Sequence, residues 1–307
     1  RNTNLSTLPI SDSNKVIEIC TSARRDVFAA IALDYRVAVL DVTGAMLSPV
    51  LMTVPPHDSA YMAIDPERDI LFVGLWTKRT IEAFHWPSGR RLWKRTSHIE
   101  IRDLLWHQRG LIVQHHSRLC QLIDSMTGER LEELRGVASV HVGDGTGPVV
   151  ITHRGRKDCW PRRVEFRESL GGVVLWTDEA MCEYGLQHAS GDGWIALSVA
   201  GAAGLRVFST AGGRLWKLDL DDYSGHFRAL TAVNNSSDVF GILFGFDRST
   251  PAYALRLDGR TGEELSRVPL EVKHVAEHPI AGERLTEAWG VLDTKDLSWT
   301  QRWLRVP

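Results

Sequence analysis

A short phrase that occurs twice constrains the fold of this chain more than any other feature. Residues 86–96 read WPSGRRLWKRT and residues 209–219 read STAGGRLWKLD, so a glycine followed closely by Arg-Leu-Trp-Lys recurs at two distant places. Catalytic motifs are rarely written twice in one chain, whereas structural units are. The duplication therefore predicts a fold that is built from repeated units.

Weaker copies of the phrase lie at residues 40–47, 124–131, 167–176 and 258–265. Aligning the copies places one turn glycine in each, namely Gly44, Gly89, Gly128, Gly172, Gly213 and Gly262. Their spacings of 45, 39, 44, 41 and 49 residues average about 44, which is the length of one four-stranded propeller blade.

A second repeat consists of a short polar turn between two apolar runs, as in AIDPERDILFVG at 63–74. Similar turns lie at 21–26, 107–110, 143–147, 190–193, 234–238 and 278–282. The flanking segments alternate in hydrophobicity or are β-branched, as strands are. Each unit is therefore predicted to hold four antiparallel strands. The polar turn joins the first two strands, and the glycine turn joins the last two.

The tryptophan that follows the glycine turn has a structural interpretation in this scheme. It recurs as Trp93, Trp176 and Trp216. One blade cannot bury its face alone, and a large aromatic side chain on the outer strand can cover the gap to the next blade. We therefore expect these tryptophans to pack blade against blade rather than to bind a ligand.

The last unit is incomplete, which bears on the number of blades. Residues 284–293 and 297–306 can form its second and third strands, but no glycine hairpin and no fourth strand follow. Residues 4–10 precede the first strand, which is expected near 15–20, and could supply the missing outer strand. Such closure removes an exposed sheet edge. We expect a single domain, residues 1–307, that is all-β and forms a seven-bladed β-propeller; a six-bladed ring with an extra hairpin is the alternative.

The repeats resemble a known group of proteins. LDVTGAML, WPSGRRLW, DSMTGERL and GGRLWKL are similar to the quinoprotein-like repeat, in which Asp and a Thr-Gly turn precede a strand that carries Trp. Blade length also resembles that of tryptophan-aspartate-repeat propellers. The resemblance covers nearly the whole chain and implies the fold. It does not imply the quinone-dependent enzymes of that group, because this chain is about half as long and lacks their adjacent cysteine pair.

Composition adds only weak limits. The formal net charge is −2, so bulk charge favours neither nucleic acid nor membrane. The four cysteines lie far apart, which argues against a disulfide framework or a zinc site and favours a cytoplasmic location. No apolar run is long enough to span a bilayer. Since the chain begins at Arg1, an upstream targeting segment is also compatible with the sequence.

No motif for catalysis, metal binding or cofactor binding emerges. GDGTGP at 143–148 is followed by a strand rather than by the helix that a phosphate loop requires, so it reads as a hairpin. The tandem pair His115 and His116 would point to opposite faces of a strand, and His274 and His278 fall on a strand and a turn. We therefore expect no cofactor and no metal, and we favour a protein without enzymatic activity.

One loop departs from the repeat and is the leading candidate for a binding site. Residues 152–163, THRGRKDCWPRR, link the second and third strands of the fourth blade and are strongly basic. The equivalent links of the second and third blades should emerge on the same face. We expect one basic, aromatic patch made of Trp76, Lys78, Arg79, His115, His116, Arg118, Arg154, Arg156, Lys157, Trp160, Arg162 and Arg163. Arginine and tryptophan dominate binding hot spots, and arginine suits carboxylate partners.

The favoured function is a non-catalytic protein-interaction module, of scaffold, adaptor or toxin-neutralising type, that binds an acidic protein partner through this patch. One alternative is an enzyme or small-ligand binder that uses the mouth of a central channel. The starts of the first strands would line that mouth with His57, Arg102, His141, Gln187, Arg228 and His274. Another alternative is nucleic acid binding through the basic loop, which the net charge of −2 disfavours.

Overall fold

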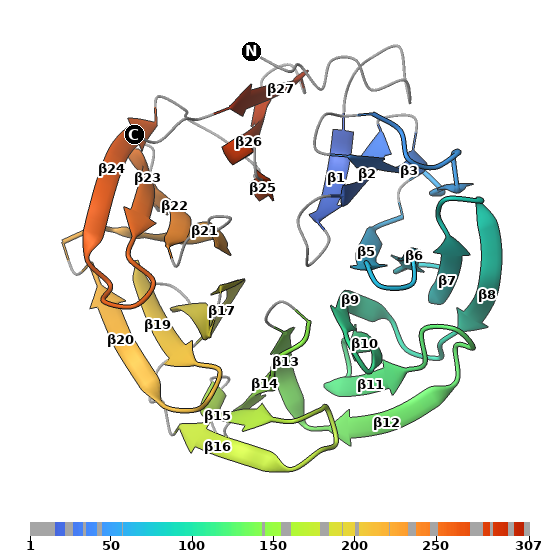
Figure 1. Ribbon diagram of the computed structural model, residues 1–307, viewed down its shortest axis with the longest axis horizontal. Coiled ribbons are helices and arrows are strands. Elements are labelled where there is room, and N and C mark those ends of the chain that lie inside the picture. The colour runs from blue at the N-terminus through green and yellow to red at the C-terminus, as the bar shows by residue number, and fades with distance from the viewer. Residues whose placement is uncertain are drawn as a thin grey trace. The chain divides into compact units, whose positions relative to one another are not determined.

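The computed structural model describes residues 16–21, 27–32, 35–41, 45–56, 58–142, 145–154, 161–178, 184–191, 193–199, 203–220, 222–232, 238–245, 251–270, 279–282, 285–293 and 298–303. All regular secondary structure in these residues is β-strand (Figure 1). None of these residues forms a helix able to cross a membrane. The chain divides into two compact units, a first unit of Arg1–Val137 with Ser169–Gly171 and a second unit of Ala138–Glu168 with Gly172–Pro307.

The first unit holds three antiparallel sheets whose strand order follows the chain. Its sheets are β1 (Val16–Thr21), β2 (Val27–Ala32), β3 (Arg36–Asp41) and β4 (Met52–Thr53); β5 (Ala60–Asp65), β6 (Ile70–Leu75), β7 (Thr80–His85) and β8 (Arg90–Thr96); and β9 (Ile101–His107), β10 (Gly110–His115), β11 (Leu119–Ile123) and β12 (Arg130–Arg135). The first strands of these sheets, β1, β5 and β9, lie beside one another (Figure 1).

The second unit continues the same pattern in the residues that are described. Its four-stranded sheets are β13 (Val137–Val142), β14 (Val149–Arg154), β15 (Pro161–Arg167) and β16 (Val174–Asp178); β17 (Tyr184–Gly191), β18 (Trp194–Val199), β19 (Gly204–Ser209) and β20 (Arg214–Asp219); and β21 (Gly225–Ala232), β22 (Val239–Gly245), β23 (Ala252–Leu257) and β24 (Glu264–Leu270). The last sheet has three described strands, β25 (Pro279–Gly282), β26 (Leu285–Asp293) and β27 (Ser298–Trp303).

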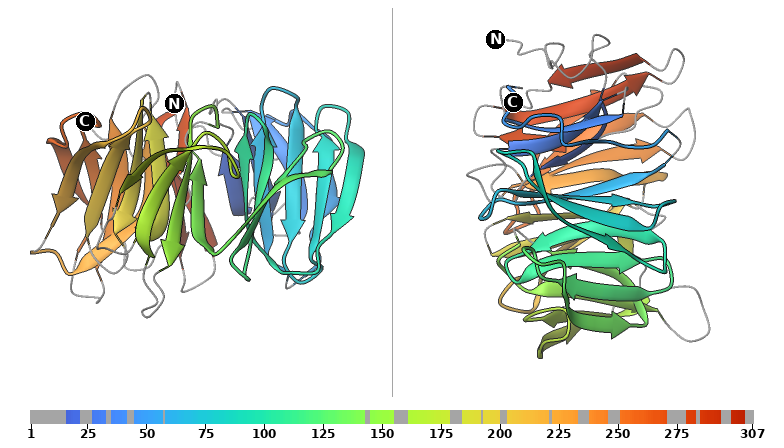
Figure 2. Two further views of the ribbon diagram at one scale, coloured as in Figure 1. Left: turned by 90° about the horizontal axis from the view of Figure 1, so that it is seen from below. Right: turned by 90° about the vertical axis from the view of Figure 1, so that its right-hand side faces the viewer.

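Both predicted repeats are confirmed by the positions of the turns. Among the described residues, the polar turns near 65–70, 107–110, 145–147 and 190–193 each join the first two strands of a sheet. The described turn glycines lie between the last two strands of four-stranded sheets: Gly89, Gly128, Gly172, Gly213 and Gly262. The expected turn at 278–282 is wrong, because Pro279–Gly282 form strand β25. Because the strands of a sheet are antiparallel, these two sets of turns share one end of each sheet. The links between second and third strands lie at the other end, together with the connectors from one sheet to the next (Figure 2).

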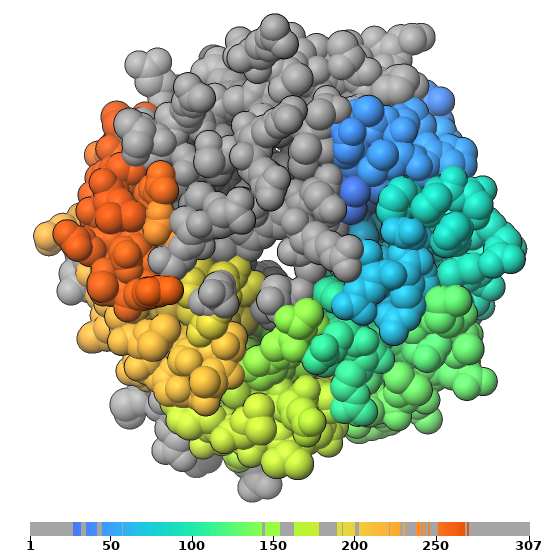
Figure 3. All heavy atoms as spheres, in the orientation of Figure 1, coloured from blue at the N-terminus to red at the C-terminus, as the bar shows by residue number. Residues whose placement is uncertain are grey.

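The hydrophobic core lies between successive sheets. Along β6, Leu71 and Val73 pack with the first sheet, whereas Ile70 and Phe72 pack with the third. Strand alternation thus places neighbouring residues in two different clusters, which explains why β6 is buried throughout. The space-filling view shows the atoms of the second and third sheets, light blue to green, in contact (Figure 3). In the second unit, Phe166 of β15 and Leu197 of β18 share a cluster in the same way.

Every fourth strand of the second to sixth sheets begins with the same irregularity. One residue is skipped in the pairing with the third strand, and that residue is always leucine: Leu92, Leu131, Leu175, Leu215 and Leu265. An extra residue of this kind is a β-bulge, which bends the strand and increases its twist. The Leu of the repeated Arg-Leu-Trp-Lys phrase is therefore the bulged residue, and the Trp is the first residue after it.

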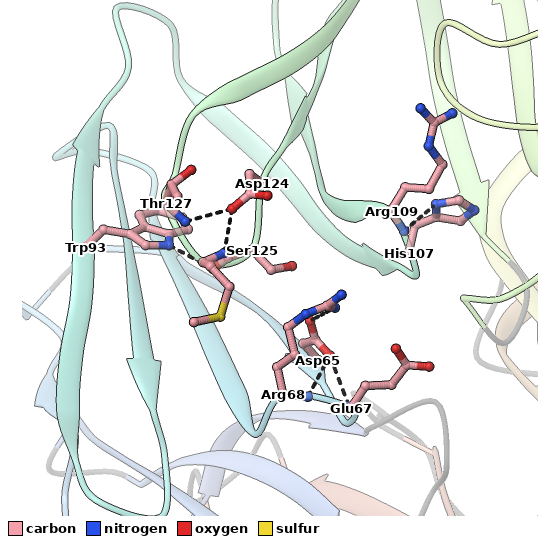
Figure 4. A network of polar contacts seen from close by, with 10 residues as sticks. Asp65, Glu67, Arg68, Trp93, His107, Arg109, Asp124, Ser125 and Thr127 are labelled. Carbon is pink, nitrogen blue, oxygen red and sulfur yellow. Dashed lines mark hydrogen bonds and ion pairs between the residues drawn. The ribbon is translucent and has the colours of Figure 1, made fainter.

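The tryptophan after the bulge fastens one sheet to the turn of the next. The indole Nε1–H of Trp93 donates to the carbonyl of Ser125 over 2.9 Å (Figure 4), and that of Trp216 donates to Gly259 over 2.8 Å. The rings lie on the turn glycines: a Cβ atom on Gly128 would come within 2.8 Å of Trp93 Cδ2. The predicted packing role of these tryptophans is confirmed.

The turn that receives the indole is shaped by its aspartate. The Oδ1 atom of Asp124 accepts the N–H groups of Met126 and Thr127 over 2.9 and 2.8 Å (Figure 4). Asp258 accepts the N–H groups of Thr261 and Arg260 in the same way, and these donors hold the pKa of its carboxyl below its usual range. The recurring Asp and Thr-Gly of the repeat therefore encode one turn geometry.

The third sheet uses a carboxylate where other sheets use an indole. Glu132 follows the bulged Leu131 and accepts the backbone N–H of Gly171 over 2.7 Å and the hydroxyl of Ser169 over 3.2 Å. Arg109 completes the contact at 3.1 Å from Glu132 Oε1. The residue after the bulge therefore bonds to the turn of the next sheet in each of these cases, whether it is a tryptophan or a glutamate.

Candidate functional site

The clearest candidate surface in the first unit is formed by two exposed links between second and third strands. Residues 76–79 join β6 to β7, and residues 116–118 join β10 to β11. All seven residues are exposed, including Trp76, whose 38% exposure is high for a tryptophan. The structure therefore brings together two of the three links that the sequence assigned to the binding patch.

The two links meet through their aromatic side chains. The rings of Trp76 and His116 lie with centroids 6.0 Å apart and planes tilted by 33°. Two hydrogen bonds also hold the backbone of the first link in place. The N–H of Trp76 donates to the carbonyl of Ser59 over 2.9 Å, and the N–H of Thr77 donates to Asp58 Oδ1 over 2.7 Å. The exposed indole thus sits on a fixed backbone rather than on a mobile loop.

Each link ends in an arginine whose backbone is strained. Arg79 has φ of 53° and Arg118 has φ of 61°, and Tyr35 before β3 has φ of 64° at the equivalent place. Left-handed backbone costs roughly 1 kcal/mol for a residue with a Cβ atom, so glycine or asparagine is the usual choice. Such strain gathers at functional sites. The carbonyl of each residue accepts an N–H from just beyond the fourth strand, from Ser97, Val137 and Val54 respectively.

The charges on this surface are only partly compensated. Arg79 reaches Glu100 Oε1 at 3.3 Å and the carbonyl of His98 at 3.4 Å. The side chains of Lys78 and Arg118 are exposed and make no hydrogen bond or ion pair with any described residue. Asp58 and Glu100 come from the connectors that precede β5 and β9, and sequence reasoning missed them. Their position directly before a first strand was the available signal.

His115 does not belong to the surface, so this part of the prediction is wrong. It is the last residue of β10 and is buried, with 4% of its surface exposed. Burial lowers its pKa, so the imidazole is neutral at pH 7 and adds no positive charge. The physical reason is strand alternation: of two adjacent histidines, one faces the packed sheet and the other, His116, faces solvent.

The basic loop of the fourth sheet is described only in part, and one of its arginines forms an ion pair on its own sheet. Arg156, Lys157 and Trp160 lie outside the described residues, and Arg154 and Arg162 are described only as strand residues of β14 and β15. Arg163 is turned onto its own sheet, at 2.6 Å from Glu165 Oε1. Glu165 also contacts His153 at 2.9 Å and Arg167 at 2.7 Å. Burial works to raise the pKa of Glu165, but Arg167 and His153 outweigh it and leave that pKa below its usual range.

Four of the six residues assigned to a channel mouth are described, and three of these four do not lie at the start of a first strand. Arg102 does lie there, as the second residue of β9. His141 is near the end of β13, buried, with Nε2 2.9 Å from Ser139 Oγ. Gln187 and Arg228 lie in the middle of β17 and β21, at irregularities of pairing that lengthen both strands. His57 and His274 lie outside the described residues.

The third sheet also holds a partly buried acid that no sequence motif indicated. Asp103 of β9 accepts the N–H of Leu104 over 2.8 Å, and burial raises the pKa of its carboxyl to about 6. The described residues contain no group of three or more His, Cys, Asp or Glu side chains that could hold a metal ion. Burial dominates the shift at Asp103, and the charge of Arg102 works against it.

Comparison with known proteins gives the fold and no more. No protein-family model and no curated protein matches the chain. Among solved structures, a chain of the mitotic checkpoint complex matches with a TM-score of 0.67 and 13% identity, over 95% of this chain and 93% of that one. The β-propeller domain of Cps50 (Swd1) from Myceliophteria thermophila matches with a TM-score of 0.67 and 7% identity, over 95% and 96%.

A bacterial structure matches as well. BamB from Moraxella catarrhalis has a TM-score of 0.55 and 16% identity, over 92% of this chain and 81% of that one. Likeness at such low identity establishes architecture alone. The resemblance that the repeats predicted is confirmed at that level: the chain has the β-propeller fold.

Proposed function

We propose that this chain is a non-catalytic protein-interaction module that binds an acidic protein partner on the face that carries the links between second and third strands. The observation that carries the proposal is the pair of adjoining links at 76–79 and 116–118. They expose an indole on a hydrogen-bonded backbone, and the charged side chains of Lys78 and Arg118 have no partner among the described residues. Tryptophan and arginine at an exposed site are the residue types that dominate binding hot spots.

Two further observations support the proposal. Arg79 and Arg118 keep their side chains at backbone positions where glycine would relieve strain, which is expected where the side chains are used. A chain of similar fold occurs in the mitotic checkpoint complex, so this architecture is found within protein assemblies. Scaffold, adaptor and toxin-neutralising roles all use a face of this kind.

Charge reversal at the two unpaired cations tests the proposal. The Lys78→Glu, Arg118→Glu double variant is expected to bind poly-L-glutamate at least tenfold more weakly at low salt, because two attractions become repulsions. The change is measured by fluorescence anisotropy against a salt titration. A matched double variant, Arg90→Glu with Arg260→Glu, reverses two exposed arginines at glycine turns, at the other end of the strands. Equal loss of binding in both double variants would reject the proposed surface.

Arg118→Gly separates binding from folding. Glycine relieves the positive φ of 61° but adds flexibility to the unfolded chain. We therefore expect the free energy of unfolding to stay level or rise by up to about 1 kcal/mol, while binding of the acidic polymer weakens. A parallel loss of stability and binding would indicate a structural role for Arg118.

We propose further that the ring has seven blades and that residues 4–10 supply the fourth strand of the last one. β27 pairs with β26 alone among the described strands, which leaves an edge for the segment to cover. Deleting residues 1–10 should then lower the melting temperature by several degrees, measured by circular dichroism. An unchanged melting temperature would favour the six-bladed alternative.

A further inference from the structure

We infer that the partner segment docking on residues 76–79 and 116–118 presents one aromatic or other large apolar side chain flanked by carboxylates. The inference rests on the proposed function and goes beyond it, because it names the anchor as well as the charge. It follows from three features of the surface: an exposed indole, a rigid support beneath it, and two unpaired cations beside it.

The indole of Trp76 is a stacking platform that nothing in the described chain covers from outside. Its exposure of 38% contrasts with Trp106 and Trp194, which are buried. His116 contacts its ring from the adjacent sheet at 6.0 Å between centroids. An aromatic or aliphatic group that stacks on such a ring gains apolar burial and a favourable ring geometry. A partner with only charged side chains would leave this apolar surface exposed to water.

The backbone beneath the platform is already ordered, so binding need not order it. The N–H groups of Trp76 and Thr77 are held by Ser59 and Asp58, and the carbonyl of Arg79 accepts the N–H of Ser97 over 2.7 Å. A preorganised site loses less conformational entropy on association than a mobile loop does. This favours recognition of a specific side chain over diffuse electrostatic attraction.

The balance of charge selects the class of partner. Lys78, Arg79 and Arg118 share the surface with Asp58 and Glu100, and Glu100 already engages Arg79. A phosphate backbone carries a charge at every nucleotide, so it cannot place charge against the two cations without also placing charge near Asp58 and Glu100. A short peptide with one or two carboxylates on either side of an apolar residue matches the two free cations and the ring together. An acidic peptide is therefore favoured over a nucleic acid.

Three labelled probes test the inference on the full chain: the peptides DEFED and DEAED and the oligonucleotide octathymidylate. We expect the phenylalanine peptide to bind about fivefold more tightly than the alanine peptide, and octathymidylate to bind more weakly than either. Trp76→Ala should erase the difference between the peptides while leaving salt-dependent binding of both. Leu131→Ala, which removes another exposed apolar side chain in the first unit, is the matched control and should preserve the difference.

The outcomes distinguish the two levels of the proposal. Equal affinity for the two peptides would overturn the anchor inference and leave an acidic partner in place. Absence of binding to either peptide, at low salt and millimolar concentration, would overturn the proposed function itself. Tighter binding of octathymidylate would overturn both in favour of a single-stranded nucleic acid, for which aromatic stacking is also used.

Discussion

Replacing Gly128 by alanine is expected to lower the free energy of unfolding by about 3 kcal/mol. Two effects add at this position. The backbone has φ of 73°, where a Cβ atom costs roughly 1 kcal/mol. The new Cβ atom would also lie 2.8 Å from Trp93 Cδ2, so the indole must leave the turn and lose its hydrogen bond to Ser125. Urea denaturation followed by tryptophan fluorescence measures the change.

Gly136 supplies the matched control for this experiment. Its φ of 79° is nearly the same, but a Cβ atom there would meet no atom within 4 Å. Gly136→Ala is therefore expected to cost only about 1 kcal/mol. The same cost is expected for Gly128→Ala in a Trp93→Ala background, because the ring that causes the clash is absent. Equal costs for Gly128→Ala with and without the indole would show that the tryptophan does not fasten the turn.

Asp103→Asn is expected to stabilise the protein at pH 7 by up to about 3 kcal/mol. Burial raises the pKa of this carboxyl from 3.8 to about 6 in the folded chain. A raised pKa means that the folded state binds the proton more tightly than the unfolded state does. The contribution of Asp103 to stability is therefore fully present below pH 4 and is lost as the pH rises through 6, where the carboxyl ionises. Asparagine keeps the oxygen that accepts the N–H of Leu104 but carries no charge.

The comparison of wild type with Asp103→Asn across pH isolates this effect. Other acids titrate equally in both proteins, so the difference in free energy of unfolding should be small at pH 4 and should grow to its full value by pH 7. Glu67→Gln, which neutralises an exposed acid in the turn after β5, should change stability by less than about 0.5 kcal/mol at either pH. A difference that is independent of pH would rule out the raised pKa as the cause.

The residues around each glycine turn show how far sequence reasoning reached. The spacing of Asp, Thr-Gly and Trp predicted the third and fourth strands, the turn between them and the packing role of the tryptophan. It did not reveal the bulge at the preceding leucine, because a bulge is defined by pairing with another strand. Nor did it reveal that Glu132 replaces the indole, since a carboxylate in that place contacts Gly171 and Ser169, which lie far along the chain.

For the candidate surface, the sequence predicted which links adjoin but not which side chains are exposed. Position in the repeat correctly placed Trp76 and His116 on adjoining links. Exposure, however, depends on which way a side chain leaves its strand, and one step in register separates the exposed His116 from the buried His115. Arg163 likewise fits the predicted loop but is turned toward Glu165, a partner on its own strand whose burial could not be foreseen.

The sequence by itself determined the repeated four-stranded unit, because a local turn and a two-residue alternation are written in neighbouring residues. Only the tertiary structure decided which charged side chains stay unpaired, which histidine is buried and which acid has a raised pKa. Those properties depend on solvent exclusion and on partners from other strands, and both arise only when the sheets pack together.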